Sequence, residues 1–270
     1  MSKIIFLGTP ELSVTILKSL LEKGYEIPLV ITSPDKPIGR KQIVTPTPVK
    51  VFAESKNLKV ITPEKLGEDV LEEITNSGAE LGIVVAYGKI IPQKIIDALP
   101  KGLLNIHYSL LPEFRGASPV ESAILEDKKE TGVTIQKLVF KLDAGPIVAV
   151  EKFPLDNQIT TPELKDKLTE IGAELLIKIL PDYIEGKIAP IEQDESKATH
   201  CGKIQKADGE IKDGGNDKEK WIKYRAFFGW PGIFYFDENG KRNKVTEAKF
   251  ENEKFIIKKI IPEGKKEISP

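Results

Sequence analysis

The chain has 270 residues, of which 40% are apolar and 30% are charged, and its formal net charge is -1 at pH 7. These values fit a globular protein with one large and one small domain, or with two domains, and they exclude a disordered chain and a uniformly basic nucleic-acid-binding module. The single cysteine, Cys201, excludes an intrachain disulfide, and with no signal peptide and no apolar run of about 18 residues we expect a cytoplasmic protein without a membrane partner.

The first part of the chain alternates short apolar runs with helical patterns. Lys3–Leu7 predicts a strand, Gly8-Thr9-Pro10 predicts a tight turn, and apolar residues then recur at helical spacing up to Leu21. Further strands are predicted at Ile27–Ile31, Leu58–Ile61, Leu81–Ala86 and Leu103–Ile106. Strands that alternate with helices predict a parallel α/β sheet.

The segment Ser33–Pro48 interrupts this pattern. It is punctuated by prolines and a glycine, so we predict a loop there. Its basic residues are Lys36, Arg40 and Lys41. Taken alone, these residues are those of a solvent-exposed basic loop.

Two apolar runs in the middle of the chain flank a predicted turn. Thr134–Leu142 and Ile147–Phe153 surround Asp143-Ala144-Gly145-Pro146, and this composition favours a hairpin or a strand-turn-strand. Pro162–Leu180 then predicts a helix with Thr161 as its N-cap. The first domain is predicted to span residues 1–184.

The last part of the chain is predicted to be a polar linker, residues 185–202, and a small second domain, residues 203–270. Strand-like runs at Ile233–Phe236 and Phe255–Ile261, with a hairpin turn at Asn239-Gly240, predict a β-rich, OB-like barrel. From Lys197 onward there are 17 Lys and Arg against 12 Asp and Glu, and before it 23 against 29. A basic module on an acidic body suits RNA, although a solvated Lys- and Glu-rich surface has the same charges.

The candidate chemical centre begins with Asn105 and His107. In a regular strand these two side chains share one face at the carboxyl end, where ligands bind in open α/β sheets. Imidazole suits proton transfer near neutral pH, and a carboxamide can donate a hydrogen bond to a developing oxyanion. Asp143 would orient or charge the imidazole. Each residue also has a plain structural interpretation, as a buried histidine or as an aspartate that only forms a turn.

These residues belong to a longer pattern. Three segments carry it: Asn-x-His-x-Ser-Leu-Leu-Pro-x-x-Arg-Gly at 105–116, Gly132-Val133-Thr134-Ile135 and Leu142-Asp143-Ala144-Gly145. Together they resemble the signature of the 10-formyltetrahydrofolate-dependent formyltransferases. Within that superfamily the chain is similar to the methionyl-tRNA formyltransferase family over nearly its whole length. The further matching segments are Phe6–Pro10, Pro34–Pro37 with Gly39-Arg40, Thr45–Lys50 and Val84–Gly88. The chain departs from the family in three ways. Its last domain is shorter, Pro146 stands where an acidic residue is common, and Phe140 precedes the region of the catalytic carboxylate.

The resemblance implies a Rossmann-like formyltransferase domain followed by a small tRNA-binding domain. It implies transfer of a formyl group from 10-formyltetrahydrofolate to the α-amino group of initiator methionyl-tRNA, without a metal. It makes Asn105, His107 and Asp143 catalytic. It assigns folate binding to Ala86, Tyr87, Gly88, Ser109, Leu110, Leu111 and Pro112. It assigns tRNA binding to Arg40, Lys41, Lys203 and Lys206. We expect a monomer.

The implied reaction is attack of the methionyl amine on the formyl carbon. Asn105 and protonated His107 would stabilise the oxyanion, while His107 and Asp143 would move the proton from the amine to the leaving nitrogen. Which of these two is the formal base stays open. The alternatives are a sugar-amine formyltransferase, a formyltetrahydrofolate hydrolase, and an RNA-binding relative without catalysis. The segment Thr45–Lys50 and the basic C-terminal module argue against the first two, and the intact trio argues against the third.

Overall fold

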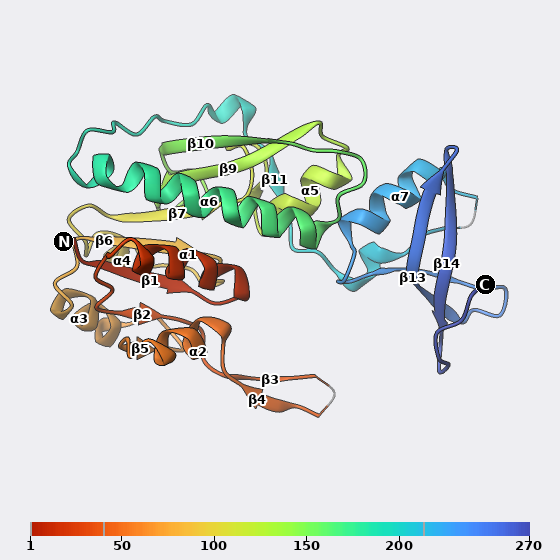
Figure 1. Cartoon of the computed structure of the whole chain (residues 1–270), viewed down its shortest axis with the longest axis horizontal. Helices are drawn as coiled ribbons and strands as arrows, with labels where there is room; N and C mark the ends of the chain where they lie inside the picture. The colour runs from red at the N-terminus through yellow and green to blue at the C-terminus, as the bar shows by residue number, and fades with distance from the viewer. Residues whose placement is uncertain (1, 40, 213) are drawn as a thin grey trace.

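The computed structural model of the chain describes residues 2–39, 41–212 and 214–270. The larger part of the protein is built on a seven-stranded sheet in the order β10-β9-β7-β6-β1-β2-β5 (Figure 1). The strands are β1 (Ile4–Gly8), β2 (Val30–Ile31), β5 (Val60–Ile61), β6 (Leu81–Val85), β7 (Leu103–His107), β9 (Glu130–Lys137) and β10 (Ile147–Pro154). The five strands from β7 to β5 are parallel, whereas β9 runs antiparallel to both of its neighbours, β7 and β10. The predicted α/β sheet is therefore confirmed, with two antiparallel strands at one edge.

Helices cover both faces of this sheet. They are α1 (Glu11–Glu22), α2 (Pro48–Ser55), α3 (Glu68–Asn76), α4 (Gln93–Ile96), α5 (Pro119–Leu125) and α6 (Thr161–Ile184). In β1, Ile4 and Phe6 pack with residues of α1 and α6, while Ile5 and Leu7 pack with residues of α3 and α4. Alternate strand residues thus enter two separate cores, which explains why the strands are continuously apolar in the sequence.

The predicted long helix is present, but its N-cap differs from the prediction. Helix α6 begins at Thr161 and is capped by Thr160, whose backbone N–H donates to the Glu163 side chain at 2.8 Å. This is one half of a capping box, in which the glutamate of the first turn satisfies a free backbone donor. Thr161 instead donates its hydroxyl to the Ala226 carbonyl oxygen at 2.7 Å and so joins α6 to the C-terminal domain.

The segment predicted to be a loop contains a short hairpin. Strand β3 (Lys36–Ile38) pairs antiparallel with β4 (Ile43–Thr45), and Figure 1 shows the hairpin projecting from the α/β body. Proline is acceptable in such a two-stranded ribbon because its missing N–H can face solvent. The loop prediction was therefore wrong for these six residues, and Arg40 lies outside the described residues.

The C-terminal part is a small β-rich domain, as predicted. Helix α7 (Asp217–Ala226) packs on an antiparallel sheet of β12 (Ile233–Phe236), β13 (Arg242–Glu251) and β14 (Lys254–Pro262). Trp221 of α7 stacks on Phe250 with ring centroids 6.2 Å apart. The Asn239-Gly240 turn is confirmed, since the Gly240 N–H donates to the Asp237 carbonyl at 2.8 Å. The order β12-β13-β14 leaves the sheet open rather than closed into a barrel among the described residues.

The segment before this domain, predicted to be a polar linker, lies against the α/β body. Its short strand β11 (His200–Cys201) pairs in parallel with β8 (Arg115–Gly116). Upstream, Ile191 exchanges two backbone hydrogen bonds with Ile147 at the start of β10. No helix in the part of the chain that the structure describes is long and apolar enough to cross a membrane.

Candidate active site

Asn105 and His107 lie together at the carboxyl end of β7. The intervening Ile106 belongs to the hydrophobic core on the opposite face, so the strand is regular, as the prediction required. Strand β7 lies between β6 and β9, and Asn105 is in register with Gln136 of β9. Asn105 is partly exposed, whereas His107 is 5% exposed.

The two ring nitrogens of His107 have different surroundings. Nε2 is 2.9 Å from the carbonyl oxygen of Phe114. A carbonyl oxygen only accepts, so Nε2 carries a proton and donates it to Phe114. Nδ1 lies 3.7 Å from Oδ2 of Asp143. The arrangement therefore points Nδ1, and not Nε2, at the carboxylate.

Asp143 is held by donors from two other elements. Its Oδ2 accepts from the Gly116 backbone N–H at 2.8 Å, and its Oδ1 accepts from Nε2 of Gln136 at 3.0 Å. Its backbone φ is 47°, in the left-handed region that aspartate tolerates in turns. Asp143 is thus a turn residue, and its carboxylate also reaches strands β8 and β9, so the two interpretations from the sequence are compatible.

The residues after β6 provide exposed backbone next to β7. Val84 is in register with Asn105, so Ala86 and Gly88 leave β6 beside the carboxyl end of β7. Both are exposed and have positive φ, 45° and 82°, and no atom lies within 4 Å of the place where a Cβ on Gly88 would be. Exposed backbone of this kind can offer its N–H and C=O groups to a ligand.

Tyr87, between them, faces the interior. Burial raises the pKa of its hydroxyl to about 12, and this hydroxyl has no hydrogen-bond partner among the described residues. Its carbonyl oxygen accepts from the Thr9 hydroxyl at 2.9 Å. This bond joins the Gly8-Thr9-Pro10 turn to the end of β6.

The turn Ser109–Pro112 is fixed from within the protein. The hydroxyl of Thr134 donates to the Ser109 carbonyl at 2.7 Å and accepts from the Leu111 N–H at 3.1 Å. The Ser109 hydroxyl is committed to the Glu113 carbonyl at 2.6 Å. Leu110 and Pro112 are partly exposed and can face a ligand, whereas Ser109 and Leu111 are buried.

The residues assigned to tRNA do not gather at the trio. Lys41 is exposed in the β3–β4 hairpin, and Lys203 and Lys206 are exposed in the segment that leads to α7. Arg40 is outside the described residues. Figure 1 shows the hairpin and the C-terminal domain projecting from the same side of the body, the side toward which β1 runs.

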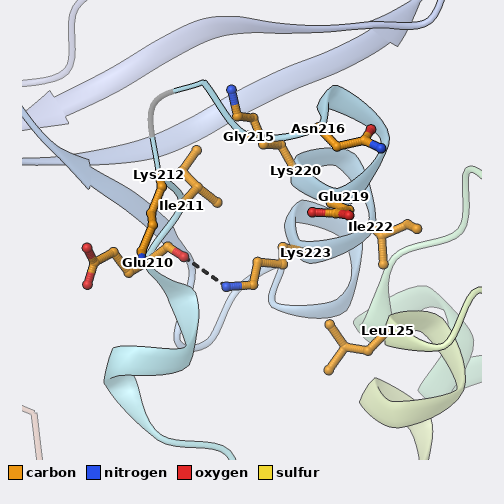
Figure 2. A pocket seen from close by; sticks show the side chains of 10 residues that line it. All are labelled: Leu125, Glu210, Ile211, Lys212, Gly215, Asn216, Glu219, Lys220, Ile222 and Lys223. Atoms are coloured by element: carbon orange, nitrogen blue, oxygen red, sulfur yellow. Dashed lines mark hydrogen bonds between the residues drawn. The ribbon is translucent and has the colours of Figure 1, made fainter.

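Two hollows of the surface lie away from the trio. One, of about 430 Å³, forms where α5 of the body meets α7 and the segment before it (Figure 2). In it, Nζ of Lys223 donates to the Glu210 carbonyl at 2.8 Å. The other, of about 630 Å³, lies along β5 and α3. Neither is lined by Asn105, His107 or Asp143.

The sequence did not single out two glutamines that contact the Asp143 turn. Gln136 of β9 donates to the Asp143 carboxylate and accepts from the Gly145 N–H at 3.2 Å. Gln193 donates to the carbonyl oxygens of Asp143 and Gly145 at 2.9 and 2.7 Å. Gln193 is 50 residues from Asp143 in the chain, and a single sequence carries no signal that joins them.

Comparison with known proteins identifies the class. A family model described as formyl transferase matches residues 2–180. An N-formyltransferase from Helicobacter canadensis, in complex with folinic acid and dTDP-3-aminofucose, superposes with a TM-score of 0.74 at 20% identity, covering 100% of this chain and 99% of that one. HypX from Aquifex aeolicus, in complex with tetrahydrofolic acid, gives 0.70 at 17% identity, covering 98% of this chain and 45% of that one. The fold and the matched residues define a formyltransferase.

Relatives with higher identity narrow this class. A methionyl-tRNA formyltransferase of Bdellovibrio bacteriovorus is 43% identical over 249 residues, which are 91% of this chain and 78% of that one. A protein of the same name from Listeria innocua is 41% identical over 255 residues, covering 94% of this chain and 81% of that one. The chain therefore belongs to the methionyl-tRNA formyltransferase family.

Proposed function

We propose that this protein transfers a formyl group from 10-formyltetrahydrofolate to the α-amino group of initiator methionyl-tRNA, as a cytoplasmic monomer. The observation that carries the proposal is the convergence of Asn105, His107 and Asp143 at the end of β7. It occurs in a chain that is 43% identical to a methionyl-tRNA formyltransferase.

In this reaction the three residues have separate tasks. The Asn105 carboxamide donates a hydrogen bond to the oxygen on which negative charge develops. His107 exchanges a proton through Nδ1, because Nε2 is committed to the Phe114 carbonyl. Asp143, with Oδ2 at 3.7 Å from Nδ1, orients the imidazole and places a negative charge beside it.

Binding of the donor is assigned to the exposed backbone after β6 and to the turn after β7. The folate supplies the activated formyl group when it is bound. Ala86 and Gly88 would contact the pterin through backbone atoms, and Leu110 and Pro112 would provide apolar contacts. The side chains of Tyr87, Ser109 and Leu111 are buried, so these residues would support the folate-contacting backbone from the protein interior.

Binding of the acceptor is assigned to basic side chains of the β3–β4 hairpin and of the segment before α7. In this division residues 1–184 are the catalytic domain, residues 185–202 the linker and residues 203–270 the tRNA-binding domain. Lys41, with Arg40, would contact phosphates from the hairpin, and Lys203 with Lys206 from the segment that enters the last domain.

The test is formyl transfer from 10-formyltetrahydrofolate to charged initiator methionyl-tRNA, beside uncharged tRNA, elongator methionyl-tRNA and a nucleotide-linked sugar amine. Transfer to the charged initiator alone is the expected result. Preference for the sugar amine, or release of formate without an acceptor, would replace the proposal with one of the other folate-dependent activities.

A further inference from the structure

Gln193 joins the Asp143 turn to a fully buried arginine. Its side-chain Nε2 donates to the carbonyls of Asp143 and Gly145, at 2.9 and 2.7 Å. Its Oε1 accepts from Nε and Nη2 of Arg115, at 3.1 and 2.8 Å. Gln193 is 9% exposed and Arg115 is 0% exposed. The nitrogen of this single buried amide therefore contacts the loop that carries Asp143, and its oxygen contacts Arg115 of β8.

Arg115 is itself held in place by an ion pair. Its Nη2 donates to Oε1 of Glu195 at 2.8 Å, and Lys141 donates to Oε2 of the same carboxylate at 2.8 Å. The hydrogen bond from Arg115, and then the one from Lys141, lower the pKa of Glu195 to about 2. Lys141 lies two residues before Asp143, so Glu195 adds a second tie between the linker and this loop.

The same segment also supports the partner of His107. The Thr199 hydroxyl accepts from the Phe114 N–H at 2.8 Å, and the Thr199 carbonyl accepts from the Arg115 N–H at 2.9 Å. The carbonyl of Phe114 is the acceptor for His107 Nε2. Residues 193–201 thus contact the backbone around both members of the His107 and Asp143 pair.

We propose that Gln193 is a positioning residue for formyl transfer, which acts by fixing the backbone of the Asp143 turn through its amide donors. This inference rests on the proposed function, because it assigns Gln193 a part in the same reaction. Gln193 lies beyond the residues 2–180 that match the family model. The chemistry would then depend on a segment outside that match, and not on the trio alone.

Two substitutions in the full chain separate positioning from folding. Gln193→Glu keeps an acceptor for Arg115 but loses both donors and puts a carboxylate against two carbonyl oxygens. Gln193→Ala loses both ends of the bridge. Glu192→Ala, at the exposed neighbouring position, is the matched control.

We expect Gln193→Glu to lower kcat about 10- to 100-fold, since small displacements of catalytic groups have effects of this size. The KM values for methionyl-tRNA and for 10-formyltetrahydrofolate should each stay within about threefold, because no substrate contact is lost. Combined with Asp143→Asn, the substitution should add less than about a twofold further loss, since Gln193 acts through that residue. The thermal midpoint of each variant is measured alongside.

The outcomes are distinguishable. Wild-type kcat in Gln193→Glu, or a loss that is fully additive with Asp143→Asn, would overturn the positioning role. If Gln193→Ala does not fold, Gln193→Glu still decides, because it keeps the pairing with Arg115. A wild-type protein that does not formylate methionyl-tRNA would instead overturn the proposed function, and the cycle would then be repeated on the acceptor that it does formylate.

Discussion

Nδ1 of His107 lies 3.7 Å from Oδ2 of Asp143, although the two residues are 36 positions apart in the chain, one on a strand and one in a loop. His107 ends β7, and Asp143 lies in the loop between β9 and β10. The imidazole cannot turn its other nitrogen toward the carboxylate without losing the bond from Nε2 to Phe114. The pair therefore presents one defined nitrogen, Nδ1, to the carboxylate.

Removal of either residue on β7 should affect turnover more than donor binding. We expect His107→Ala and Asn105→Ala each to lower kcat by about two to three orders of magnitude, from the loss of acid-base help or of one oxyanion donor. Folate affinity, measured by calorimetry, should change little. Near wild-type turnover in steady-state assays of either variant would remove that residue from the centre.

Asp143 should behave as part of a unit with His107. Asp143→Asn loses the charge beside Nδ1 and should be strongly defective. The double variant with His107→Ala should be scarcely slower than the slower single variant, as is found for residues that work together. The comparison requires single-turnover rates for all four proteins. Losses that multiply fully would mean that Asp143 serves only the turn.

Much of the fold was predictable because the local sequence patterns, the apolar runs and the turn residues, agree with the tertiary structure. The strand that carries Asn105 and His107 was predicted from its apolar run, and the run is apolar because both faces of the sheet are covered. The turn around Asp143 followed from its glycine and proline. The hairpin β3–β4 was not predicted, since two strands of three residues give no recognisable alternation.

The supports of the site could not be predicted from one sequence. Gln193 contacts Arg115 across 78 positions, and glutamine has no local signature of burial. Arg115 lies in a recognisable motif, but the charge of a fully buried arginine is accommodated only by partners that the fold brings together, here Gln193 and Glu195. Periodicity can locate the candidate catalytic residues, whereas the contacts that hold them depend on distant segments.

Gly145 should tolerate no side chain. A Cβ there would lie 1.7 Å from the carbonyl oxygen of Lys137, which is backbone and cannot move aside. Gly145→Ala should therefore destabilise the protein by about 1–3 kcal/mol, as overpacking does, and displace the neighbouring Asp143. Gly202→Ala is the control, because nothing lies within 4 Å of its Cβ position. Equal urea midpoints for the two variants would contradict this expectation.

The ion pair between Arg115 and Glu195 should contribute to stability in a defined pH range. The pKa of Glu195 is about 2 in the folded protein, below its ordinary value of 4.5. The folded state thus binds this proton less readily than the unfolded state, so the contribution is present above pH 4.5 and disappears as the pH falls to about 2. The thermal midpoints of wild type and Glu195→Gln should differ most near neutral pH and converge in acid. A difference that stays constant down to pH 2 would rule out the ion pair as its source.

Binding of tRNA should depend on salt through the basic residues of the hairpin and of the segment before α7. Phosphate contacts release counterions, so affinity for methionyl-tRNA should fall steeply with added salt. Charge-neutralising Lys203 and Lys206 should weaken binding and flatten the slope of log K against log salt by up to about one unit for each lost contact. Lys41→Ala should likewise weaken binding and flatten the slope. Arg40→Ala, a prediction that rests on the sequence alone, should raise the KM for methionyl-tRNA much more than that for 10-formyltetrahydrofolate.

Lys178→Ala, at an exposed position on α6, is the matched control and should leave the slope unchanged. The measurement is filter binding of the full-length variants at several salt concentrations. Slopes equal to that of the wild type for the Lys203 and Lys206 variants would restrict the RNA contact to the hairpin, and an unchanged slope in Lys41→Ala as well would remove both surfaces from the proposal.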